Sequence, residues 1–140
     1  MNPEEVTLNT RLEEIPLAHE ALDAFATRHA LPVPMLGRLH VAIEEHLSNI
    51  ISYGYDPGQG GTIRVHFELA FPFLRVKIED DGRRFNPMDA PPVDTSLALD
   101  KKPVGGLGVH LLRKCVDELS YSRCGERNVL SLASRVTPAS

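Results

Sequence analysis

The stretch Leu39–Tyr55, LHVAIEEHLSNIISYGY, decides the fold. Its apolar residues recur at helical spacing and should face a core. They are Leu39, Ile43, Leu47, Ile50 and Ile51. Glu45 and Asn49 lie four residues apart on another face, where a carboxylate can accept a proton and an amide oxygen suits Mg²⁺. Two solvated residues on an ordinary amphipathic helix would give the same pattern, so this helix alone leaves both interpretations open.

The composition is that of a soluble globular chain. Hydrophobic residues are 42% and charged residues 24% of the 140 residues, which predicts one domain, residues 1–140, with a single core. The net charge of −4 gives no general attraction to nucleic acid or anionic lipid. No apolar run approaches the roughly 20 residues that span a bilayer, and the acidic N-terminus has no apolar signal segment. We therefore expect a cytoplasmic protein in which Cys115 and Cys124 are reduced and mostly buried.

Hydrophobic periodicity predicts the other elements around this central helix. In chain order, the expected elements are a strand at about 5–11, helices at 15–29 and 39–54, strands at 62–69 and 74–78, a helix at 105–116, and strands at 119–123 and 128–136. Residues 83–104 have no periodicity and four prolines, which indicates a functional lid. This order predicts an α/β (α+β) two-layer sandwich, with a mixed, mostly antiparallel sheet covered by helices on one face.

Two segments with glycines follow the central helix. DDG, residues 80–82, lies where a strand leaves the sheet. Its first carboxylate can accept a hydrogen bond from an exocyclic amine such as that of adenine, and its glycine lets a flat ring lie against the backbone. GGLG, residues 105–108, begins a helix whose free N–H groups can bind phosphate. Each segment alone is weak evidence, and the second matches neither the P-loop nor GxGxxG.

The order of these segments is more specific than any one of them. E-x-x-x-N on a helix, then D-x-G, a proline-rich lid and G-x-G at a helix start resembles the GHKL superfamily. That superfamily is the ATP-binding Bergerat fold of histidine kinases, gyrase-type ATPases and Hsp90-type chaperones. IEEHLSNIISYGY, DDGRRFNP and GGLGVHLLRKCVDELSY are similar to its anti-sigma-factor serine/threonine kinase branch. The resemblance covers about residues 5–136.

The resemblance implies a role for individual residues. Glu45 would be the general base, with Glu44 ranked second, and Asn49 would bind Mg²⁺. Asp80 would accept the adenine amine, with Gly82 under the ring. The implied cofactors are ATP and Mg²⁺. The nucleotide-binding residues would be Asn49, Asp80, Gly82, Phe85, Gly105, Gly106, Leu107 and Gly108, and positive charge could come from Arg83, Arg84, Lys101 and Lys102.

Several positions depart from the family pattern. Arg84 replaces the second glycine of D-x-G-x-G, and Tyr53 replaces a histidine often found before Gly-Tyr. The late threonine that helps to hold the adenine-site acid has no clear match, and Ser131 or Asn128 could substitute for it. The two histidines of the central helix, His40 and His46, could be considered as metal ligands. They are expected to pack at the surface or in the core instead, because no set of metal ligands accompanies them.

The resemblance also implies an activity and partners. The protein would be an anti-sigma factor and a protein kinase that uses Mg-ATP to phosphorylate a serine or threonine of an STAS-domain anti-anti-sigma partner. Such phosphorylation would release that partner and let a sigma factor bind instead. A homodimer is expected, with no direct contact to nucleic acid or membrane. Three alternatives remain: a non-catalytic ATP-binding switch, a stand-alone histidine-kinase-type ATPase domain, and a structural domain with a lapsed site.

Overall fold

The computed structural model describes residues 4–89 and 106–136. Its strands and helices follow the predicted order, with two short 3₁₀ helices in addition. The elements are β1 (Glu4–Asn9), η1 (Leu12–Glu14), α1 (Ile15–His29), α2 (Val33–Tyr53), β2 (Thr62–Ala70), β3 (Phe73–Asp80), η2 (Pro87–Asp89), α3 (Gly106–Cys115), β4 (Glu118–Cys124) and β5 (Arg127–Arg135). No helix within these described ranges is both long and apolar enough to cross a bilayer.

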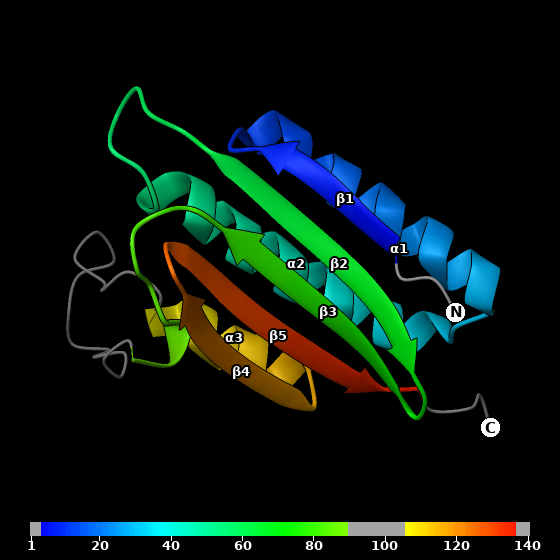
Figure 1. Cartoon of the computed structure of the whole chain (residues 1–140). Helices are drawn as coiled ribbons and strands as arrows, with labels where there is room; N and C mark the ends of the chain where they lie inside the picture. Colours follow the sequence, from blue (N-terminus) through cyan, green and yellow to red (C-terminus); the bar gives the residue numbers. More distant parts are fainter. Residues whose placement is uncertain (1–3, 90–105, 137–140) are drawn as a thin grey trace.

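The five strands form one sheet in the order β1-β2-β3-β5-β4. Every neighbouring pair is antiparallel, so the described strands contain no parallel pair. Figure 1 shows α1, α2 and α3 together on one face of this sheet. The predicted two-layer architecture, with helices on one face, is therefore confirmed.

The core lies between the sheet and the helices. Alternate residues of β2 and β3 and the apolar stripe of α2 are completely buried in it, as the two periodicities predict. These residues are Ile63, Val65, Phe67, Leu74, Val76, Ile78, Leu39, Ile43 and Leu47. Because β3 is the central strand and packs under α2, the end of β3 is brought next to that helix.

Some predicted details are wrong at the element ends. α2 begins at Val33, six residues earlier than expected, because Pro32 is its N-cap and its first turn tolerates a second proline. Cys124 is exposed and Cys115 is only half-buried, so the expectation of mostly buried thiols is wrong for Cys124. Cys124 ends β4 beside the β4–β5 turn, where the sheet edge leaves it open to solvent. Residues 87–89 of the predicted lid form η2, and its residues 90–104 lie outside the described ranges.

Candidate functional site

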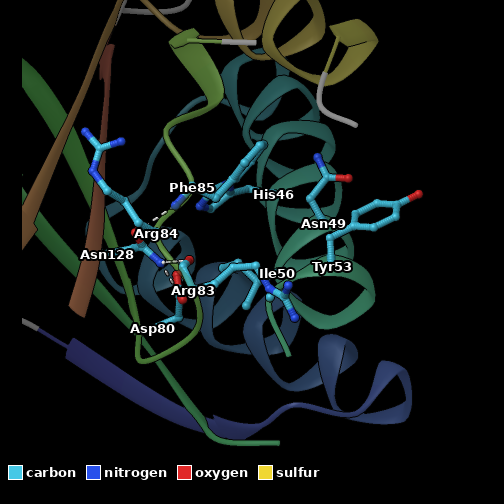
Figure 2. Close-up of a pocket in the computed structure, with 10 residues that line it drawn as sticks. His46, Asn49, Ile50, Tyr53, Asp80, Arg83, Arg84, Phe85 and Asn128 are labelled. Carbon is cyan, nitrogen blue, oxygen red and sulfur yellow. Dashed lines mark hydrogen bonds between the residues drawn. The ribbon is translucent and has the colours of Figure 1, made fainter. Parts of the chain in front are cut away.

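A cavity of about 360 Å³ lies between α2 and the segment that follows β3. This volume is at the lower end of the range for small-molecule pockets. Figure 2 shows the α2 residues on one side of the cavity and Asp80, Arg84 and Asn128 on the other. The lining residues are His46, Asn49, Ile50, Tyr53, Gly54, Asp80, Arg83, Arg84, Phe85 and Asn128.

One face of α2 forms a wall of the cavity. His46, Asn49, Ile50 and Tyr53 are spaced at i, i+3, i+4 and i+7, so a regular helix carries them all on this face. Glu45 lies one turn before Asn49 on the flank of the same face. It is half-buried and does not line the cavity in the described residues. A ligand group that extends from the cavity past Asn49 toward the start of α2 would approach Glu45.

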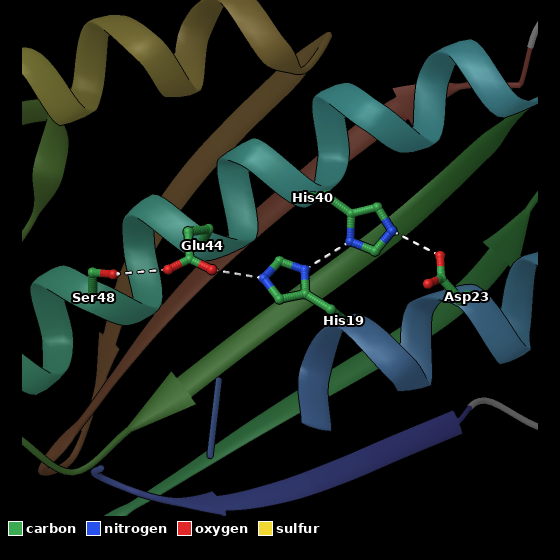
Figure 3. Close-up of polar contacts among 5 residues, drawn as sticks. All are labelled: His19, Asp23, His40, Glu44 and Ser48. Carbon is green, nitrogen blue, oxygen red and sulfur yellow. Dashed lines mark hydrogen bonds and ion pairs between the residues drawn. The ribbon is translucent and has the colours of Figure 1, made fainter. Parts of the chain in front are cut away.

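The neighbouring carboxylate, Glu44, points elsewhere. Its Oε1 lies 2.8 Å from Nε2 of His19 on α1, and its Oε2 accepts a hydrogen bond from Ser48. The two ring Nδ1 atoms of His19 and His40 lie 2.7 Å apart, and Nε2 of His40 lies 2.8 Å from a carboxylate oxygen of Asp23 (Figure 3). Glu44 therefore belongs to an interhelical cluster rather than to the cavity, and His40 does more than pack.

Asp80 supplies a buried hydrogen-bond acceptor at the end of β3. It is only 2% exposed, and its Oδ1 accepts hydrogen bonds from the Gly82 N–H at 2.9 Å and from Nδ2 of Asn128 at 3.0 Å. Burial raises the pKa of Asp80 above its ordinary value, although these two hydrogen bonds act in the opposite direction. The carboxylate is therefore fixed in orientation where it lines the cavity.

Asn128 holds the site together from β5. Its Nδ2 donates to Asp80 and to the Arg83 carbonyl at 2.8 Å, and its Oδ1 accepts from the Phe85 N–H at 3.2 Å and from the Tyr121 hydroxyl. Asn128 pairs directly with Asp80 in the β3–β5 ladder. It is therefore Asn128, not Ser131, that holds the acid, since Ser131 pairs with Lys77, three residues before Asp80 on β3.

The second aspartate, Asp81, has a structural role, because it joins two neighbouring segments by hydrogen bonds. Its Oδ1 accepts hydrogen bonds from the Tyr55 hydroxyl and from the Thr62 N–H, which ties the turn after α2 to the start of β2. Its pKa is lowered: partial burial acts upward, but these hydrogen bonds outweigh it. Gly82 lies against Gly54, where an added Cβ would come within 2.8 Å of the Gly54 carbonyl oxygen. This close approach explains the glycine without reference to a ligand.

The structure describes only some of the other residues predicted to bind the nucleotide or to supply positive charge to its phosphates. Arg83 and Arg84 both line the cavity; Arg83 pairs with exposed Asp56 at 2.8 Å, and Arg84 lies over the Tyr121 ring. Gly106, Leu107 and Gly108 form the first turn of α3. The three that lie outside the described residues are Lys101, Lys102 and Gly105.

The site contains no preformed metal cluster in the described residues, where no group of three or more His, Cys, Asp or Glu is arranged to hold an ion. A magnesium ion would therefore depend on Asn49 together with oxygens of a ligand, which is usual for this ion. His46 is 3% exposed, as expected for core packing, but it also lines the cavity. Sequence periodicity could have placed it on the buried face, since it lies three residues after Ile43 and four before Ile50.

Comparisons with known proteins find relatives over most of the chain. A family profile described as "Histidine kinase-like ATPase domain" matches residues 8–134. The serine/threonine-protein kinase BtrW of Bordetella bronchiseptica is 29% identical over 119 residues, 85% of this chain and 84% of that protein. The serine-protein kinase RsbW of Bacillus subtilis is 24% identical over 119 residues, 82% of this chain and 74% of that protein.

Among solved structures, the RsbU and RsbW domains of Rv1364c from Mycobacterium tuberculosis share the fold. That match has a TM-score of 0.72 at 18% identity and covers 99% of this chain. The chain spans about a third of that solved protein, 34% of its length. At this identity the likeness concerns the fold alone.

Proposed function

This chain belongs to the histidine kinase-like ATPase family, and on that premise we propose that it is an ATP-dependent kinase that phosphorylates a serine or threonine of a partner protein. The observation that carries the proposal is the buried acceptor Asp80, fixed by Asn128 in the wall of a cavity of about 360 Å³. The relatives named as serine kinases support the choice of substrate side chain.

The residues that line the cavity have the chemistry that a nucleotide requires. Asp80 offers an acceptor for an exocyclic amine, and Ile50 and Phe85 offer apolar surface for a flat ring. The two arginines that line the cavity, Arg83 and Arg84, can balance phosphate charge. We place ATP here, with Gly106, Leu107 and Gly108 toward its phosphates, because free N–H groups at the start of a helix favour anions.

Bound Mg-ATP would supply the phosphoryl group and a charge-neutralising ion. Asn49 would hold the ion through its amide oxygen. Glu45, one turn before it, would orient the incoming hydroxyl and take its proton. Positioning and charge neutralisation account for most of the catalysis in such transfers, so the fixed spacing of Glu45 and Asn49 on one helix matters more than their individual reactivity.

The proposed partners rest on the resemblance to the anti-sigma-factor kinase branch rather than on the cavity. We propose an STAS-domain anti-anti-sigma protein as the phosphorylated partner, a sigma factor as the second partner, and a homodimer of single-domain chains in the cytoplasm. Phosphorylation would add close to two negative charges to an interface that accepts a neutral hydroxyl, and would so release the first partner. One observation favours a second candidate, a non-catalytic ATP-binding switch: Glu45 does not line the cavity.

The first experiment tests nucleotide binding. Thermal unfolding with Mg-ATP at about 100 times its dissociation constant should raise Tm by about 9 °C, and Asp80→Asn should abolish the shift. An unchanged Tm in the wild type would refute nucleotide binding.

The second experiment tests catalysis. With radiolabelled ATP and an STAS-domain protein from the same genome, Glu45→Ala should bind nucleotide but fail to phosphorylate that protein. Glu44→Ala, the matched control, should remain active. Equal phosphorylation by Glu45→Ala would refute the assignment of the base, whereas binding of nucleotide without any phosphorylation by the wild type would leave only the switch.

A further inference from the structure

We propose that His46 hydrogen-bonds the uncharged part of the bound nucleotide, its base or its ribose, and sets much of the affinity of the pocket for the nucleoside. The inference rests on the proposed nucleotide-binding function and adds a residue to it. None of the features that define the E-x-x-x-N segment requires a histidine at this position, which directly follows Glu45.

His46 is buried within the wall of the cavity. Its side chain is 3% exposed, and it shares the cavity-lining face of α2 with Asn49 and Ile50. In Figure 2 it extends from α2 toward the segment that carries Phe85. A molecule bound in the cavity can therefore contact His46.

One ring nitrogen of His46, Nδ1, is buried without a hydrogen-bond partner in the described part of the protein. Burying an unpaired polar atom costs folding free energy, so such an atom in a cavity wall requires an explanation. A half-turn of the ring about the Cβ–Cγ bond exchanges Nδ1 with Cδ2 and Nε2 with Cε1, so the imidazole can offer a nitrogen to a ligand in either orientation.

The surroundings indicate which part of a nucleotide His46 contacts. The charged groups that face the same cavity are Asp80, Arg83 and Arg84. Burial lowers the pKa of His46 to about 4, so the ring is neutral at pH 7 and contributes no positive charge. The arginines meet the needs of phosphates, whereas a neutral donor and acceptor suits a ring nitrogen or a ribose hydroxyl.

The test compares nucleotide affinity in His46→Leu and in a matched control. Ser134 Oγ is another buried atom without a partner, and it lies six residues from Asn128 on β5, about 20 Å away along the strand. Calorimetry should show about tenfold weaker binding of ATP, ADP and adenosine to His46→Leu, as expected for one lost hydrogen bond. Ser134→Ala should bind all three like the wild type. With 2′-deoxy-ATP the loss disappears if the partner is the 2′-hydroxyl, with 3′-deoxy-ATP it disappears if the partner is the 3′-hydroxyl, and it persists with both if the partner is the base.

The unfolding of the ligand-free variants separates this role from a structural one. Both His46→Leu and Ser134→Ala remove a buried unpaired atom, so each should be at least as stable as the wild type. Weaker binding by a more stable protein supports a ligand contact. Unchanged binding by His46→Leu overturns the inference and leaves the proposed function intact, as does a loss seen with ATP and ADP but not with adenosine. A wild type that binds none of these ligands overturns both.

Discussion

Acidification should destabilise the protein through His46 in particular. Burial lowers the pKa of this histidine from its ordinary 6.5 to about 4, so between these values the unfolded chain binds more protons than the folded one. Stability is therefore complete above about pH 6.5 and falls as the pH drops toward 4. A tenfold difference in proton affinity corresponds to about 1.4 kcal/mol, so the full loss from His46 is about 3 kcal/mol.

The assay is urea unfolding at a series of pH values from about 7.5 to 4. The chain has three tyrosines and no tryptophan, so circular dichroism of the helices is the appropriate signal. The pKa of Asp80 is raised, so above pH 3.8 acidification stabilises the folded state through this residue, opposite to its effect through His46. Asp80 is present in both proteins, so its contribution cancels when His46→Leu is compared with the wild type. The difference in unfolding free energy should widen by about 3 kcal/mol on acidification. If the unfolding free energies of the wild type and His46→Leu change in parallel with pH, the lowered pKa of His46 is refuted. The unfolding free energy of Ser134→Ala should change with pH as that of the wild type does.

Three further predictions concern the framework of the site. Asn128→Ala removes the four side-chain hydrogen bonds described above and a longer one, of 3.4 Å, to the Gly82 carbonyl. It should lower the unfolding free energy by about 3 kcal/mol in urea; a loss under about 1 kcal/mol would contradict its central position. Gly82→Ala places a Cβ 2.8 Å from the Gly54 carbonyl and should cost about 1–3 kcal/mol, whereas Gly37→Ala, exposed within α2 with nothing within 4 Å, should stabilise by about 0.5–1 kcal/mol. His19→Ala breaks the contact between α1 and α2 and should cost about 1 kcal/mol; an unchanged urea midpoint would show that this half-exposed cluster contributes nothing.

Periodicity was enough to find the elements, because α2 and the β2–β3 hairpin bury one face each at their own repeat. It failed at the start of α2, where prolines suggested a break but instead occupied positions that need no N–H partner. It also left open which residue holds Asp80. That depends on the register of β3 against β5, which places Asn128 directly opposite, and no local pattern encodes this pairing.

The position of His46 was predictable, but its significance was not. The repeat of Ile43, Leu47 and Ile50 puts residue 46 on the buried side of α2, and the sequence alone favours simple packing there. Only the folded structure reveals that this wall faces a cavity and that Nδ1 is without a partner. A polar group that lowers stability in a core is one of the local conflicts that natural proteins retain at functional sites.

The adjacent acids of α2 show how the fold separates two chemically identical side chains. A helix turns about 100° per residue, so Glu44 and Glu45 necessarily face different neighbours. Glu44 meets α1, where His19 holds its carboxylate at 2.8 Å, and so it is directed away from the cavity. Glu45 is left on the flank beside Asn49, without a bonding partner among the described residues. The buried apolar stripe of α2 sets the rotation of this helix, and the contact with His19 holds Glu44 on the side of α1, away from the cavity.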